Sequence, residues 1–174
     1  MEQIKSLIRT IPDFPQPGIQ FRDLTTLFLD AIGFRQAIAA LCDPWRDQAI
    51  DMVVGVESRG FIVAAPVAVL LNSGFVPVRK PGKLPGETFG VEYTLEYGED
   101  RLEIHRDALG IGARVLMVDD LLATGGTLEA ACRLVEDIGC EVVGCAVIAE
   151  LPDLKGRQRL KGYHVSSLVQ FEGD

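Results

Sequence analysis

The chain has 174 residues, of which 48% are hydrophobic and 24% are charged, and this composition predicts one globular domain with a full hydrophobic core. Its formal net charge of −8 argues against general nucleic-acid binding, which needs a positive field. The longest apolar run, Phe61 to Leu71, is too short to span a bilayer, and the N-terminus lacks the order of a signal peptide, so we expect a cytosolic protein with neither nucleic-acid nor membrane partners.

The N-terminal part predicts two helices separated by a turn-rich segment. Apolar residues at helical spacing predict an amphipathic helix over residues 2–11 and a second helix from Phe34 to Leu41. Between them, three prolines and Gly18 within residues 12–18 favour an extended segment with turns.

Short apolar strands alternate with helices over the rest of the chain. Strands are predicted over 51–56, 75–79, 114–118, 141–148 and 165–169, and helices after Gly60 and over 128–138. Pro66 should remove a hydrogen bond from the first of these helices and kink it. Residues 80–90 read as a loop or flap, and 94–95 and 102–104 are expected to pair as a hairpin. The alternation predicts an α/β fold with a mainly parallel sheet covered on both faces.

The cysteines and a C-terminal basic run predict structural roles. Cys132 lies on an apolar helical stripe and Cys145 in an apolar strand, as expected for buried thiols. No C-x-x-C pair occurs, and two histidines supply a zinc site poorly. Four basic residues between 155 and 161 predict a solvated helix or turn in this acidic chain; they are Lys155, Arg157, Arg159 and Lys161.

Segment 115–127 carries the strongest chemical signal. It reads VLMVDDLLATGGT, an apolar strand followed by two acids, a loop of small residues and the start of a helix. Gly125 and Gly126 allow the backbone to turn sharply and to approach a ligand, and the helix N-terminus offers unpaired N–H groups and the positive end of its dipole. With the hydroxyls of Thr124 and Thr127, these features predict a phosphate-binding loop.

The two acids, Asp119 and Asp120, follow the strand at its carboxyl end, where α/β sheets bind ligands. Carboxylates repel a phosphate, but they suit sugar hydroxyls and a hydrated magnesium ion. Two other phosphate-binding motifs do not match the sequence. The chain has no G-x-x-x-x-G-K-[ST] loop, and the G-x-G-x-x-G series that Gly110 begins has Val115 in the last position and precedes a strand.

Segment 115–127 resembles the motif with which type I phosphoribosyltransferases bind phosphoribosyl pyrophosphate (PRPP). Residues 13–23 resemble the base-binding hood of the adenine phosphoribosyltransferases in particular, 57–61 their pyrophosphate loop, and 80–86 with 95–98 their flexible lid. The resemblance covers essentially the whole chain. It implies one domain over 1–174 with the type I phosphoribosyltransferase fold, a twisted, mainly parallel sheet flanked by helices, with a small hood at about 1–35 and a lid hairpin at about 80–105.

The same resemblance implies a role for each matched residue. The 5′-phosphate of PRPP or AMP would be bound by Ala123, Thr124, Gly125, Gly126 and Thr127. Pyrophosphate would be bound by Glu57, Ser58, Arg59 and Lys80, helped by Arg79 and Lys83. Adenine would stack between Phe21 and Leu121, with its edge paired to backbone groups of Gln20 and Arg22. The catalytic residues would be Glu96, as acid/base partner of the purine, with Arg59, Asp119 and Asp120.

The resemblance thus implies a pentosyltransferase that transfers phosphoribosyl from PRPP to N9 of adenine, giving AMP and pyrophosphate in purine salvage. It also implies a homodimer and Mg²⁺, bound through PRPP and indirectly by Asp119 and Asp120. Taken alone, Phe21 could be a core residue, Arg59 a surface ion-pair residue and Glu96 a solvated acid. Two alternatives stay open: a non-catalytic PRPP or nucleotide sensor, and a transferase for hypoxanthine/guanine or orotate. The segments 57–60 and 96–97 favour an enzyme, and the hood favours adenine.

Overall fold

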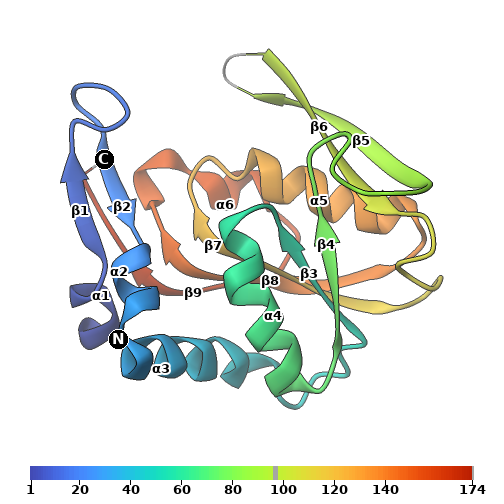
Figure 1. The fold of residues 1–174 in the computed structure, drawn as a ribbon, viewed down its shortest axis with the longest axis horizontal. Coiled ribbons are helices and arrows are strands. Elements are labelled where there is room, and N and C mark those ends of the chain that lie inside the picture. The colour runs from blue at the N-terminus through green and yellow to red at the C-terminus, as the bar shows by residue number, and fades with distance from the viewer. Residues whose placement is uncertain (96–97, 174) are drawn as a thin grey trace.

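A five-stranded parallel sheet forms the centre of the molecule. The structure is a computed structural model that describes residues 1–95 and 98–173, without the side chains of residues 94–99. The strand order is β4-β3-β7-β8-β9 (Figure 1). The strands are β3 (Met52–Val56), β4 (Gly74–Val78), β7 (Arg114–Leu122), β8 (Glu141–Glu150) and β9 (Val165–Gln170). All four neighbouring pairs are parallel, which confirms the predicted sheet.

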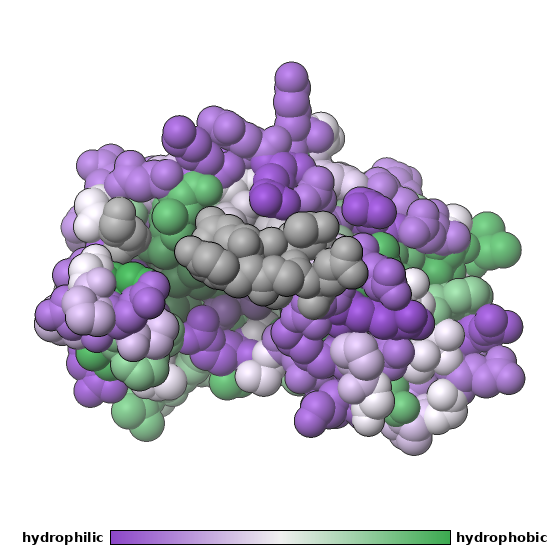
Figure 2. Space-filling model, turned by 90° about the horizontal axis from the view of Figure 1, so that it is seen from above, coloured by the Kyte–Doolittle hydropathy of each residue, from purple (hydrophilic) through white to green (hydrophobic). Residues whose placement is uncertain are grey.

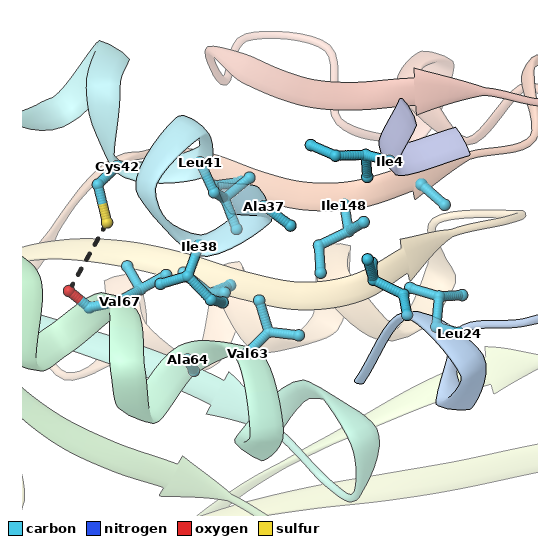
Figure 3. Close-up of a cluster of buried hydrophobic side chains, with 14 of the residues drawn as sticks. Ile4, Leu24, Ala37, Ile38, Leu41, Cys42, Val63, Ala64, Val67 and Ile148 are labelled. Carbon is cyan, nitrogen blue, oxygen red and sulfur yellow. Dashed lines mark hydrogen bonds between the residues drawn. The ribbon is translucent and has the colours of Figure 1, made fainter. Parts of the chain in front are cut away.

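Helices cover both faces of this sheet. Helices α3 (Ala31–Cys42) and α4 (Arg59–Leu71) lie on one face, and α5 (Gly126–Asp137) lies on the other (Figure 1). Successive strand residues point to opposite faces, so Val53 joins the core under α4 and Val54 the core under α5. Figure 3 shows the first of these cores, where Ile38 and Leu41 of α3 meet Val67 of α4. Both faces are buried, as the continuous apolar strands predict.

The predicted helix over residues 2–11 is wrong in its second half. Helix α1 (Glu2–Ser6) is followed by β1 (Arg9–Pro12), which pairs antiparallel with β2 (Gln20–Asp23) before α2 (Thr25–Leu29) begins. The β-branched Thr10 and Ile11 favour a strand, and Arg9 pairs with Asp23 at the far end of the ladder. Hydrogen bonds from Thr25 and Arg9 lower the pKa of Asp23 to about 2.

The predicted hairpin is longer than its sequence signal. Strands β5 (Thr88–Leu95) and β6 (Gly98–His105) pair antiparallel from Thr88 opposite His105 to Leu95 opposite Gly98. Val91 and Tyr93 of β5, with Leu102 and Ile104 of β6, are buried in the core that α5 covers. The ladder also includes residues 88–90, which the prediction had placed in the loop, because they pair with residues 103–105 of β6.

Other boundaries and side chains refine the predictions. Helix α4 begins directly at Arg59 and continues through Pro66 to Leu71. Strand β7 continues past Val118 through both acids to Leu122, because residues 119–122 pair with β8.

Cys132 and Cys145 are free, buried thiols, as predicted. The remaining short elements are η1 (Asp43–Trp45), η2 (Pro152–Leu154) and α6 (Gly156–Arg159). In the part of the chain that the structure describes, no helix combines the length and apolar character that crossing a membrane requires.

Candidate active site

A cleft of about 370 Å³ opens where β3 and β7 end and α4 and α5 begin. The crossover connections of a parallel sheet bring such strand ends and helix starts to one edge, which is the usual ligand site of α/β proteins. Figure 2 views the molecule from above, and hydrophilic residues predominate on this side. The cleft is lined by Val56, Glu57, Ser58, Arg59 and residues 119–128. Two segments predicted separately, the pyrophosphate loop and the PRPP motif, therefore form one site.

The predicted phosphate-binding loop, residues 123–127, has the geometry of an anion site. Gly125 has a φ of +82°, in the left-handed region that favours glycine, and precedes the first residue of α5. The first turn of such a helix leaves N–H groups without intrahelical partners and carries the positive end of the helix dipole. Thr124 and Thr127 line the same cleft and add hydroxyl groups. The loop can therefore bind a phosphate with backbone and side-chain donors.

The two acids lie beside this loop and interact with each other. Asp119 Oδ1 accepts a hydrogen bond from the backbone N–H of Asp120 at 2.9 Å. Burial, and then the neighbouring charge of Asp120, raise the pKa of Asp119 well above its usual range. Burial also raises the pKa of Asp120, although the charge of Arg59 opposes this effect. Arg59 therefore offsets the burial of the two carboxylates only in part, and a nearby cation or hydroxyl donors would offset it further.

Arg59 connects the acids to the N-terminal hood. Its Nε lies 2.8 Å from Asp120 Oδ2, and its guanidinium carbon lies 5.5 Å from the centre of the Phe21 ring. Phe21 also meets Phe14 edge to face, with ring centres 5.1 Å apart. Phe21 is only half-buried and belongs to neither buried core. Arg59 is therefore not merely a surface ion-pair residue, because it joins the hood to the cleft.

The predicted pyrophosphate residues divide into two groups. Glu57, Ser58 and Arg59 line the cleft, with a cis peptide bond between Glu57 and Ser58. Arg79, Lys80 and Lys83 lie in the adjoining segment after β4 and do not line it. Glu57 Oε2 connects the two groups, accepting hydrogen bonds from Arg79 Nε at 2.9 Å and from the backbone N–H of Lys80 at 3.0 Å.

Two residues of the hairpin were missed by the sequence interpretation. Lys80 Nζ pairs with Asp100 of β6, which also accepts a hydrogen bond from Tyr93 OH at 3.2 Å. Burial raises the pKa of Tyr93 and the nearby Thr127 side chain opposes this effect, so Tyr93 lies between the hairpin and the phosphate-binding loop. The alternation of β5 places Tyr93 on the inner face, but nothing in the sequence pairs Asp100 with Lys80. Glu96, the predicted acid/base residue, lies outside the described residues.

Comparison with known proteins agrees with this geometry. The family model of the phosphoribosyl transferase domain matches residues 30–172. The adenine phosphoribosyltransferase of Methylobacillus flagellatus is 59% identical over 97% of both chains, and that of Clostridium perfringens is 56% identical over 97% of this chain and 98% of its own.

Solved structures give the same result for the fold. The crystal structure of adenine phosphoribosyltransferase from Thermoanaerobacter pseudethanolicus has a TM-score of 0.95 at 50% identity, covering 98% of this chain and 99% of that one. The Trypanosoma brucei enzyme, in complex with AMP, pyrophosphate and ribose-5-phosphate, has a TM-score of 0.88 at 27% identity, covering 97% and 78%. The central parallel sheet, the phosphate-binding loop and these near-full-length matches together show that the chain belongs to the adenine phosphoribosyltransferase family, within the type I phosphoribosyltransferase fold.

Proposed function

We propose that the protein transfers phosphoribosyl from PRPP to N9 of adenine, giving AMP and pyrophosphate in purine salvage. One observation carries the proposal: the cleft places a helix N-terminal phosphate-binding loop, two adjacent carboxylates and Arg59 together, with the aromatic Phe21 of the hood against Arg59. Family membership supports the same reaction. Each part of the cleft matches a different part of the two substrates.

The PRPP-binding residues follow from the chemistry of the cleft. We assign the 5′-phosphate to residues 123–127, whose N–H groups and hydroxyls are donors. Asp119 and Asp120 suit the 2′- and 3′-hydroxyls of the ribose, which donate to carboxylates. Arg59, with the backbone of Glu57 and Ser58, lines the same cleft from the β3–α4 connection and suits the pyrophosphate. Lys80 would join it by exchanging Asp100 for pyrophosphate, with Arg79 and Lys83 adding positive charge.

The adenine site belongs to the hood in this proposal. Phe21 would stack on the base, Leu121 of the cleft would cover its other face, and backbone groups of Gln20 and Arg22 would pair with its edge. A carbonyl and an N–H at this edge match the N6 donor and N1 acceptor of adenine and leave mismatched groups of other purines unpaired. Glu96 would exchange a proton with the imidazole part of the base.

In the reaction, N9 of adenine forms a bond to ribose C1 while the C1–O bond to pyrophosphate breaks, and N9 loses its proton. Arg59 and the lysines of the lid would stabilise charge on the leaving pyrophosphate. Hard oxygen donors such as Asp119 and Asp120 fit Mg²⁺, held through water and through PRPP, and the ion would mask further charge of the pyrophosphate. Closure of the lid over the cleft would exclude water.

The test is an assay of the purified protein with PRPP, Mg²⁺ and adenine, hypoxanthine, guanine or orotate, followed by chromatography of the nucleotide product. We expect AMP from adenine and no product from the other bases. A product from another base would move the protein to that specificity. Measurable PRPP binding without any product would instead support a sensor.

We also propose a homodimer, which an exposed apolar surface on α2, α3 and α4 supports. Leu29 is 84% exposed and Val69 is 77% exposed, and both line a groove of about 570 Å³ with Pro66 and Leu70. Contiguous apolar surfaces of this kind mark protein interfaces. Because α4 begins at Arg59, a second copy bound here would support the helix that carries an active-site residue.

Replacing both Leu29 and Val69 by glutamate is expected to convert the dimer to a monomer, because two charges cannot be buried unpaired in an apolar interface. Light scattering after size-exclusion chromatography measures the mass. Ile111→Glu is the matched control, since Ile111 is 89% exposed but lies outside this groove. A wild-type monomer, or a double variant that stays dimeric, would contradict the proposed interface.

A further inference from the structure

Glu150 is a buried carboxylate with an unusually complete set of donors. It ends β8 opposite Leu122 of β7 and is 3% exposed. Arg157 donates from Nε to Oε1 at 2.6 Å and from Nη2 to Oε2 at 2.8 Å. Ser167 Oγ and Gln170 Nε2 donate to Oε2 at 2.7 and 3.2 Å. Burial alone would raise the pKa of Glu150, but these hydrogen bonds outweigh it and lower the pKa.

Arg157 fixes a short segment that has little structure of its own. It belongs to α6, whose four residues are too few to be stable as a helix. Besides Glu150, its guanidinium donates to the carbonyl of Val165 at 2.8 Å and to Ser167 Oγ at 3.1 Å. Arg157 therefore ties α6 to β8 and β9. The predicted solvated helix or turn is confirmed for this run, and Arg157 in addition binds a buried carboxylate, which the sequence interpretation missed.

The segment that Arg157 fixes packs directly behind the phosphate-binding loop. A Cβ added to Gly156 would lie 2.3 Å from the carbonyl oxygen of Ala123, and one added to Gly125 would lie 2.7 Å from the carbonyl oxygen of Gly156. Two stretches of backbone thus touch with no side chain between them. The position of residues 123–125 consequently depends on where Gly156 is held.

We infer that Glu150 and Arg157 are positioning residues for the 5′-phosphate of PRPP and AMP, acting through Gly156 on the loop of residues 123–125. Neither residue lines the cleft. This inference rests on the proposed function, because it assigns that loop to the 5′-phosphate. The inference predicts an effect on the binding of the 5′-phosphate and none on the binding of the pyrophosphate. The residues assigned to the pyrophosphate come from the end of β3 and the start of α4, and neither element takes part in the hydrogen bonds of Glu150 and Arg157.

The test uses Arg157→Lys, which keeps the charge but loses the paired hydrogen bonds, and Glu150→Gln, which keeps the shape but loses the charge. We expect the KM for PRPP and the inhibition constant of AMP to rise about tenfold, as a small displacement of a binding group does. The KM for adenine and the dissociation constant of pyrophosphate should stay within about twofold, because neither ligand depends on the loop.

Arg159→Lys is the matched control on the same helix. Arg159 pairs only loosely with Glu129, with 3.6 Å between Nη1 and Oε2, and its side chain is 48% exposed. This variant should leave every constant within about twofold. If Glu150→Gln does not fold, Arg157→Lys and Ser167→Ala carry the test.

Two results would overturn the inference. One is a lower melting temperature of Arg157→Lys with unchanged PRPP and AMP constants, which would make the pair purely structural. The other is an equal weakening of pyrophosphate binding. If the wild-type protein proved to have no transferase activity, the proposed function would fail separately, and calorimetric titration of the same variants with AMP and with pyrophosphate would still decide the inference.

Discussion

Replacing Asp119 and Asp120 together by asparagine is expected to lower kcat/KM for PRPP in the formation of AMP by about 10³-fold. Each charge-assisted hydrogen bond to a buried group contributes about 1.5–3 kcal/mol, so two of them correspond to about 10²- to 10⁴-fold in rate. The asparagines keep the shape of both side chains, and the new amide oxygen at position 119 can still accept the hydrogen bond that Asp119 Oδ1 accepts from the backbone N–H of residue 120. Chromatography of AMP formed under saturating adenine measures the loss. Asp47→Asn, at an exposed position far from the cleft in sequence, is the control.

The single change Asp119→Asn should at the same time stabilise the ligand-free protein at pH 7. Because the folded-state pKa of Asp119 lies above its unfolded value, ionisation of this group costs stability once the pH exceeds the unfolded pKa of about 4. The variant's gain in melting temperature should therefore be present at neutral pH and shrink as the pH falls toward about 4. A variant that is less stable than the wild type at pH 7 would show that the carboxylate is compensated without ligand.

The cleft was largely predictable because its main parts are consecutive in the sequence. Asp119, Asp120 and the glycines at 125 and 126 lie within one segment, and a parallel sheet places the end of its strand at the ligand edge. Local patterns were enough to find the strand, the turn and the helix. The resemblance to a family then supplied the roles that residue types alone leave open.

The missed features depend on contacts between distant residues. The ladder that converts residues 9–12 into β1 needs β2, and helical periodicity in residues 4–11 gives no sign of it. Lys80 meets Asp100, and Arg157 meets partners at 150, 165 and 167. A run of alternating basic residues is usually solvated. Only the fold shows that Arg157, whose side chain is 44% exposed, pairs with a buried carboxylate, whereas Arg159, which is 48% exposed, pairs loosely with the more exposed Glu129.

Gly125→Ala is expected to raise the KM for PRPP by about 10²-fold, the scale that misplacing a binding group by about 1 Å reaches. Gly125 has a φ of +82°, and its new Cβ would lie 2.7 Å from the carbonyl oxygen of Gly156. Because the obstacle is backbone held by the Glu150–Arg157 pair, no side chain can move aside to relieve the clash. The loop must shift instead, and the N–H groups that face the phosphate shift with it. Initial rates at varied PRPP measure the change.

Gly112→Ala separates the clash from the backbone conformation. Gly112 has a similar φ of +79°, but a Cβ there would meet no atom within 4 Å. This variant should therefore lose about 1 kcal/mol of stability, the cost of a left-handed alanine, and keep its KM for PRPP. If Gly125→Ala behaved in the same way, with lower stability and a KM within about threefold of the wild type, the close contact with Gly156 would not control the loop. A large rise in the KM of Gly125→Ala, together with a loss of stability no greater than that of Gly112→Ala, would instead assign the effect to that contact, because the two variants share the cost of a left-handed alanine.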